Sequence, residues 1–157
     1  MKTLVVYDSM FGNTEKIARA VGEALGSMEE VQVVKTSAVT SEMLRQASLL
    51  LVGSPTHGFN PSNDMKAFLA GLAAGSLNGK RAAAFDTRVD VKQINNKMLT
   101  FFTNLMGYAA ENIAKQLHKK GAALVSPSEG FIVEDKEGPL REGELERATD
   151  WAKKIVA

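Results

Sequence analysis

The first segment of the chain that offers residue types for ligand chemistry runs from Ser9 to Thr14 and reads Ser-Met-Phe-Gly-Asn-Thr. It joins an apolar, β-branched run to a stretch with helical periodicity, so it ends at a helix N-terminus. Unpaired backbone N–H groups and the helix dipole make such a terminus an anion site, to which Ser and Thr hydroxyls add neutral donors. Gly12 would let the backbone approach a ligand closely. These side chains are also common helix caps, so the loop by itself leaves phosphate binding and capping equally open.

Other chemistries that depend on a defined motif find little support in the sequence. The stretch Gly75–Arg81 has the wrong spacing for a P-loop and precedes an expected strand. A dinucleotide-type glycine motif does not follow the first strand, and only His57 and His118 could serve a nucleophilic triad. A phosphate-accepting receiver domain would need an Asp where the third strand ends in Gly53-Ser54-Pro55, and Asp8 alone cannot build a metal pocket. We therefore expect no metal site and no catalytic acid or base.

Alternating hydrophobic periods along the chain predict strands separated by helices. The expected strands are Lys2–Tyr7, Val31–Lys35, Ser48–Gly53, Arg81–Phe85 and a last strand, Ala122–Val125 with Phe131–Val133, that Pro127 and Gly130 interrupt. The expected helices begin at Thr14, cover Ser41–Gln46 and Asp64–Ala73, form a long tract with a break near Gly107, and end the chain between Leu145 and Val156.

This order of elements predicts an α/β fold in which a doubly wound parallel sheet is covered by helices on both faces. We expect one domain, residues 1–157. In an open sheet of this kind a ligand lies beyond the carboxyl ends of the strands. The loops 8–14, 54–63 and 86–93 are therefore the candidates for a binding site.

Composition excludes several classes of protein. The 157 residues include 19 Lys+Arg and 18 Asp+Glu, a net charge of +1, and no Cys. The absence of Cys excludes disulfides, thiolate metal sites and dithiol redox couples. The balanced charge argues against a nucleic-acid partner or a polybasic membrane binder. The apolar run Leu4–Tyr7 is too short to span a membrane or form a signal peptide, so we expect a cytoplasmic protein without a membrane span.

The first loop also carries a family resemblance. The segment Val5–Val21 resembles the flavodoxin signature, with an aromatic residue, two hydroxyls and small or aliphatic residues at the places that this signature requires: Tyr7, Ser9, Gly12, Thr14, Ala18 and Val21. The loop Gly53–Gly58 and the strand end Phe85–Arg88 look like the family's two flavin-contacting loops, so the resemblance covers essentially the whole chain. It implies a five-stranded, three-layer flavodoxin-like sandwich with the strand order 2-1-3-4-5 that defines this fold, and FMN between strands one and three.

The resemblance implies three groups of FMN-binding residues, one that cradles the phosphate and two that flank the isoalloxazine ring. They are Ser9, Met10, Phe11, Gly12, Asn13 and Thr14; Pro55, Thr56, His57, Gly58 and Phe59; and Asp86, Thr87 and Arg88. Gly58 matches the glycine whose peptide, in this family, turns its carbonyl toward flavin N5 when the ring takes up a proton. A residue that tolerates positive φ makes that rotation cheap.

Three features depart from a standard member of the family. Such proteins are usually acidic around the flavin, whereas this chain is balanced and places Arg88 in the third loop. His57 stands where the family often has an aromatic residue, and it is expected either over the flavin or exposed in the loop. Trp151, the only tryptophan, is expected in the core.

The third departure is the segment Val89–Met106, in which apolar side chains recur at helical spacing: Ile94, Met98, Phe101, Phe102, Leu105 and Met106. This stripe would cap the core, cover the flavin, or form a dimer or substrate surface.

Taken together, these observations predict an FMN-binding protein that carries one or two electrons between redox partners, a reductase and an acceptor. One alternative is an FMN-dependent oxidoreductase that acts on a quinone or a similar aromatic substrate. Another is a non-redox regulatory domain that binds a different phosphate ligand.

Overall fold

The computed structural model describes residues 2–27, 29–90 and 107–157. Its strands are β1 (Thr3–Tyr7), β2 (Val31–Lys35), β3 (Leu49–His57), β4 (Asn60–Pro61), β5 (Arg81–Val89), β6 (Ala123–Leu124) and β7 (Glu129–Val133). Its helices are α1 (Asn13–Leu25), a short 3₁₀ turn (Thr36–Ala38), α2 (Ser41–Gln46), α3 (Asn63–Gly71), α5 (Ala109–Lys119) and α6 (Glu144–Val156).

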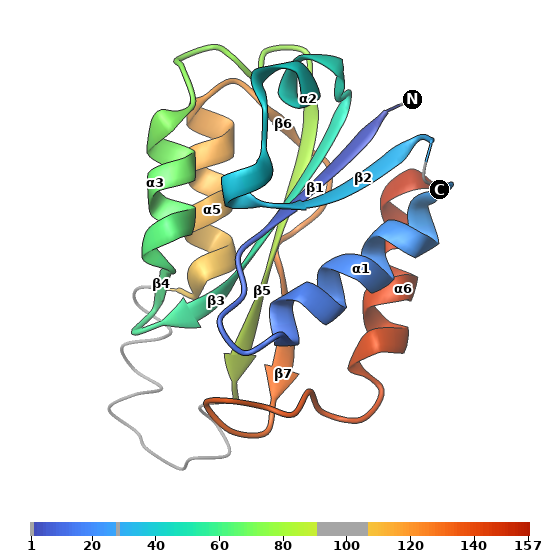
Figure 1. Ribbon diagram of the computed structural model, residues 1–157, viewed down its shortest axis with the longest axis vertical. Coiled ribbons are helices and arrows are strands. Elements are labelled where there is room, and N and C mark those ends of the chain that lie inside the picture. The colour runs from blue at the N-terminus through green and yellow to red at the C-terminus, as the bar shows by residue number, and fades with distance from the viewer. Residues whose placement is uncertain (1, 28, 91–106) are drawn as a thin grey trace.

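The sheet has the order β2-β1-β3-β5-β6, and β7 also pairs with β5 (Figure 1). All of these pairs are parallel; the two-residue β4 runs antiparallel to β3. Both β6 and β7 lie along β5, so they are two pieces of one interrupted strand. The predicted parallel α/β fold with the order 2-1-3-4-5 is confirmed. Seven strands rather than five result from this interruption and from the small β4.

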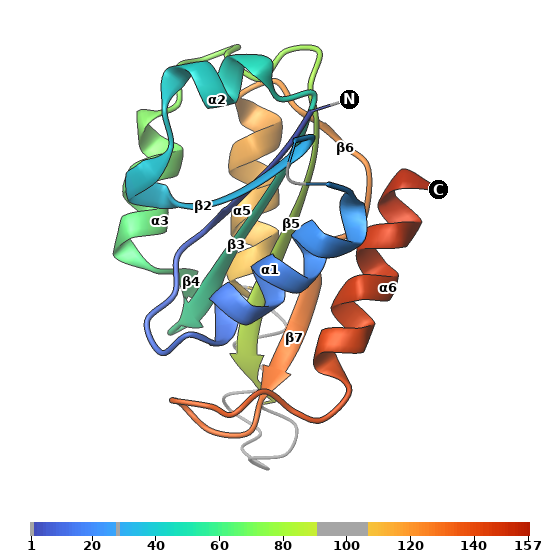
Figure 2. The ribbon, with the colours of Figure 1, turned by 45° about the vertical axis from the view of Figure 1, so that its right-hand side comes forward.

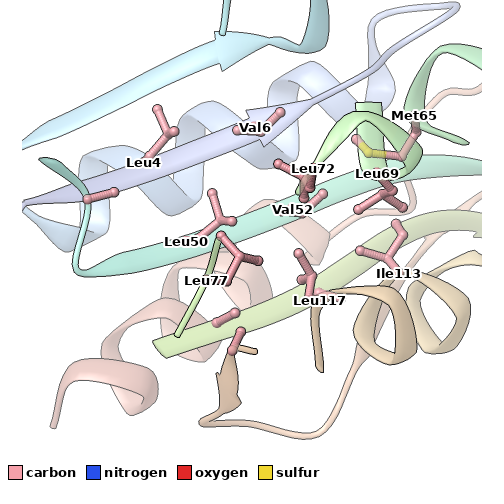
Figure 3. Packing of buried hydrophobic residues seen from close by; sticks show 14 of the residues in the cluster. Leu4, Val6, Leu50, Val52, Met65, Leu69, Leu72, Leu77, Ile113 and Leu117 are labelled. Carbon is pink, nitrogen blue, oxygen red and sulfur yellow. The ribbon is translucent and has the colours of Figure 1, made fainter. Parts of the chain in front are cut away.

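Helices cover both faces of the sheet, with α3 and α5 on one side and α1 and α6 on the other (Figures 1 and 2). Successive strand residues point to opposite faces, and both faces of the central strands are apolar. Leu4, Val6, Leu50 and Val52 pack toward α3 and α5, where they meet Met65, Leu69, Ile113 and Leu117 (Figure 3). Burial on both sides explains the near-continuous apolar strands of the sequence.

The opposite face confirms the expectation for Trp151. Its side chain is 7% exposed and packs edge-on against Phe85 and Phe131, with ring centroids 5.9 and 6.1 Å away. The indole N–H donates to Ser126 Oγ at 3.2 Å. The tryptophan therefore anchors α6 to the sheet.

Two strands are longer than the sequence predicts. We expected loops from residue 54 and from residue 86, but β3 continues to His57 and β5 to Val89. The reason is mutual pairing: Ser54 and Pro55 pair with Asp86 and Thr87, while β7 holds the other side of β5 as far as Val89. The ends of both strands are therefore built into the sheet.

The expected long helical tract after the fourth strand appears as α5 in the part of the chain that the structure describes. The predicted apolar stripe of residues 89–106, with its proposed dimer or covering role, lies outside the described residues except for Val89 and Asp90. None of the helices in the described ranges is long and apolar enough to cross a membrane.

Candidate functional site

A cavity of about 390 Å³ lies at the carboxyl ends of the central strands, next to the start of α1. Its wall is built from four stretches of chain: Ser9, Met10, Phe11, Asn13 and Thr14; Pro55, Thr56, His57 and Gly58; Thr87, Arg88 and Val89; and Val133 with Lys136. The three loops singled out by the sequence thus meet in one place. Of the predicted residues, Gly12, Phe59 and Asp86 do not line the cavity.

The loop before α1 has the geometry of an anion site. Gly12 has φ +91°, and no side chain caps the helix that follows. Ser9 Oγ instead accepts a hydrogen bond from Gly12 N–H at 3.1 Å within the loop. The capping interpretation of these hydroxyls is therefore not what the structure shows. An uncapped N-terminus leaves its first backbone N–H groups available to a ligand.

Thr14 connects this loop to the third one. Its hydroxyl lies 2.7 Å from the hydroxyl of Thr87, and both side chains are buried. Met10 and Phe11, by contrast, are 60% and 45% exposed although they also line the cavity. The loop thus combines a fixed hydroxyl pair with two apolar side chains at its outer edge.

The second stretch ends in a tight hairpin turn between β3 and β4. Gly58 and Phe59 have φ values of +52° and +72°, the pattern of a type I′ turn, which favours Gly and Asn. Phe59 is a non-glycine residue in a costly conformation. Two amides hold the turn: Asn60 Nδ2 donates to the Gly58 carbonyl and Asn112 Nδ2 to the Phe59 carbonyl, both at 3.1 Å. His57, just before the turn, is exposed and lines the cavity.

The third stretch contains a buried ion pair. Arg88 Nε and Nη2 donate to the two carboxylate oxygens of Asp86 at 2.7 and 2.8 Å, and the Ala110 N–H donates to the same carboxylate at 2.9 Å. Complete burial raises the pKa of Asp86, while Arg88 and the Ala110 N–H favour its charged form. Asp86 therefore faces the start of α5, and the Arg88 side chain belongs to the cavity wall.

Arg88 occupies a slot formed by residues distant in sequence. Its guanidinium carbon lies 3.5 Å from the ring centroid of Tyr108. A Cβ at Gly130 would come within 2.2 Å of that same carbon, so only glycine leaves room for the arginine. Thr56 Oγ1 accepts a hydrogen bond from Ala109 N–H at 3.3 Å, which ties α5 to β3 as well. Sequence reasoning missed Tyr108, Ala110 and Gly130, because no local pattern connects them with Asp86.

The fourth stretch, with Val133 and Lys136, was also missed. Together with Arg88, Lys136 gives the described cavity wall two basic residues, while no Asp or Glu lines it there. An excess of basic side chains in a cleft favours an anionic ligand. No local sequence pattern indicates that residue 136 lies near the start of α1.

The arrangement can bind, at one end, an anion on backbone N–H groups and hydroxyls and, at the other, a flat group between residues 55–58 and 87–89. Within the described ranges, no cluster of His, Asp and Glu could hold a metal ion. These features make the cavity a candidate binding site for a phosphorylated ligand.

Comparison with known proteins finds a matching family model, related sequences and similar solved structures. The family model described as Flavodoxin matches residues 5–151. A flavodoxin of Clostridium saccharobutylicum is 30% identical over 110 residues, 68% of this chain and 68% of that protein. A flavodoxin of Aquifex aeolicus is 40% identical over 91 residues, 55% of this chain and 49% of that protein. Among solved structures, a flavodoxin from the domain Archaea is similar over 99% of this chain and 96% of its own, with a TM-score of 0.77 and 25% identity.

Proposed function

The chain belongs to the flavodoxin family and is an FMN-binding electron-transfer protein, and we propose that the cavity beside α1 is the place where it holds FMN. The observation that carries this proposal is the uncapped start of α1, where Ser9 and Thr14 line the cavity and the Gly12 N–H donates to Ser9 Oγ. Neutral hydroxyls and backbone N–H groups at a helix N-terminus suit a phosphate ester.

The residues present fit FMN at both ends. Ser9 to Thr14 would hold the phosphate, and Pro55 to Phe59 with Asp86 to Arg88 would flank or support the ring. Of this last group, Thr87 and Arg88 line the wall, while the buried Asp86 holds Arg88 in place. Residues 1–157 would then form one FMN-binding domain.

The flavin supplies the redox chemistry when it is bound, and the protein binds, orients and electrostatically tunes it. Backbone groups of the first loop fix one end of the cofactor. The β3–β4 turn places the Gly58 peptide at the cavity, with its carbonyl held by Asn60 Nδ2 at 3.1 Å. A glycine at φ +52° can rotate this peptide cheaply, provided that the Asn60 hydrogen bond is released.

The partners that we propose are a reductase and an acceptor protein, in a cytoplasmic setting. The two apolar side chains at the outer edge of the cavity, Met10 and Phe11, are exposed and could contact them. The comparisons do not favour the oxidoreductase and regulatory alternatives, because the family model and the relatives named above are flavodoxins.

Substitution of Ser9 tests the proposed site. We expect Ser9→Ala to weaken FMN binding about tenfold, because a hydrogen bond to a charged group is lost. Ser27→Ala, the same change in an exposed serine after the other end of α1, should leave the affinity unchanged. The measurement is quenching of FMN fluorescence on titration. Equal affinities of the two variants would place the phosphate elsewhere.

A further inference from the structure

The connection between β7 and α6 forms a small hairpin that reaches the cavity. Val133 and Leu140 form an antiparallel bridge, and the Glu134 N–H donates to the Pro139 carbonyl at 2.8 Å. The Gly138 N–H donates to the Asp135 carbonyl at 2.9 Å and closes a four-residue turn. Lys136 is the second residue of this turn, so the backbone fixes its position.

The tip of the hairpin rests on the first residue of α1. Asn13 Nδ2 donates to the Glu137 carbonyl at 3.1 Å. Gly138, with φ +107°, allows this close approach, because a Cβ there would lie 2.8 Å from the Asn13 amide. In Figures 1 and 2 the same connection passes beneath the ends of β5 and β7 toward the start of α1. Residue 136 therefore lies beside the helix N-terminus at which an anion is expected.

The two basic residues of the cavity wall differ in whether a carboxylate neutralises their charge. Arg88 is bonded through two nitrogens to the buried carboxylate of Asp86. Lys136 lines the cavity, and its ammonium forms no ion pair within residues 2–27, 29–90 and 107–157.

The acidic residues next to Lys136 do not cancel this charge inside the cavity. Glu134, Asp135 and Glu137 are not among the described residues that line it. Glu134 pairs with Arg141 at 3.4 Å, and an Asp135 carboxylate oxygen accepts the Lys136 N–H at 2.7 Å. Lys136 thus supplies the net positive charge of the described wall.

We propose that Lys136 recognises the phosphate of the cofactor and makes the site select FMN over riboflavin, which lacks that phosphate; this inference depends on the proposed FMN site. A phosphate monoester carries about −1.5 to −2 charges at neutral pH. The other groups that face it from the first loop are neutral donors. A flexible ammonium from the hairpin adds a charge-assisted contact that only the phosphorylated flavin can use.

The test is a titration of the flavin-free full-length chain with FMN and with riboflavin. We expect Lys136→Gln to weaken FMN binding about three- to tenfold at low salt. This loss of affinity is larger than that for removing an exposed charge pair and smaller than that for removing a partly desolvated one. Riboflavin affinity should stay within about twofold, since neutral ligands gain little from the charge. Lys154→Gln, which removes the same charge from the exposed face of the last turn of α6, is the matched control and should change neither affinity.

Salt provides an independent readout. At about 1 M salt the screening length is about 3 Å, so the difference between wild type and Lys136→Gln should nearly disappear. Lys136→Arg should retain the preference for FMN. Equal losses for FMN and riboflavin, or no loss for FMN, would overturn the role of Lys136. If wild-type protein binds neither flavin, the FMN site itself is wrong.

Discussion

Two walls of the cavity are held in place by different means. The phosphate wall, residues 9–14, consists of backbone and short hydroxyls at the start of α1, and two of its side chains are largely exposed. The ring wall, residues 55–58 and 87–89, is backed by the buried ion pair of Asp86 with Arg88, which has ties to Tyr108, Ala110 and Gly130. The phosphate wall is tied to the rest of the chain by single hydrogen bonds of Asn13 and Thr14, whereas the ring wall contains a buried ion pair. Substitutions in the ring wall should therefore cost far more folding stability than those in the phosphate wall.

The largest effect is expected from Asp86→Ala. This change leaves the Arg88 guanidinium, whose side chain is 16% exposed, without its buried counter-charge. Breaking one partner of a buried pair typically costs about 3–5 kcal/mol. The free energy of unfolding from urea titration measures the loss.

A double variant provides the control for this prediction. In Asp86→Ala/Arg88→Met no unpaired charge remains, so part of the lost stability should return. A loss below about 1 kcal/mol for Asp86→Ala alone would mean that the ring wall is not built around this pair.

A smaller loss is expected for Gly130→Ala. The new Cβ would meet the Arg88 guanidinium at 2.2 Å and force it out of its slot. Overpacking of this kind costs about 1–3 kcal/mol. Gly71→Ala is the control, because no atom lies within 4 Å of a Cβ at that position. It should keep or slightly raise the stability, and equal losses in both variants would argue against the slot.

The third prediction concerns Glu144, the first residue of α6. Glu144 Oε2 accepts the Ile132 N–H at 2.7 Å and the Arg147 guanidinium at 2.7 Å, and Arg147 also donates to the Gly130 carbonyl. Burial acts to raise the pKa of Glu144, but the hydrogen bonds from Arg147 and Ile132 outweigh it, so the pKa is lowered.

A lowered pKa in the folded state stabilises the protein above the pKa of the unfolded chain, about 4.3. This stabilisation is lost as the pH falls through the folded pKa. Glu144→Gln should therefore cost about 1–2 kcal/mol at neutral pH, and this cost should shrink as the pH falls through the lowered pKa of the folded state. Urea midpoints of both proteins across this range provide the measurement. A gap between them that widens toward acid pH would contradict the assignment.

The contrast between the walls also explains what the sequence could predict. The loop from Ser9 to Thr14 was recognised because its residues, its preceding strand and its following helix are contiguous. The strand order and the burial of Trp151 were predicted as well, since they follow from the family resemblance and from the apolar pattern. The apolar residues that form the two hydrophobic layers recur at regular spacing along the sequence, so the strands and helices that carry them can be predicted locally.

The ring wall could be predicted only in part. Arg88 and Asp86 were both assigned to the site, but nothing near them in sequence indicates that Asp86 turns away toward Ala110. The sequence predicts that Gly130 interrupts a strand, but in the structure this glycine also leaves space for Arg88. Lys136 was missed because a hairpin brings it to α1 through one amide contact, Asn13 to Glu137. Such contacts depend on tertiary structure.

Titration of the flavin-free chain with FMN, followed by visible absorption and fluorescence, shows whether the cavity holds the cofactor. We expect one FMN per chain, bound at micromolar protein concentration and weakened by Ser9→Ala. Absence of bound FMN under these conditions, or binding that Ser9→Ala leaves unchanged, would contradict a cofactor site between the two walls.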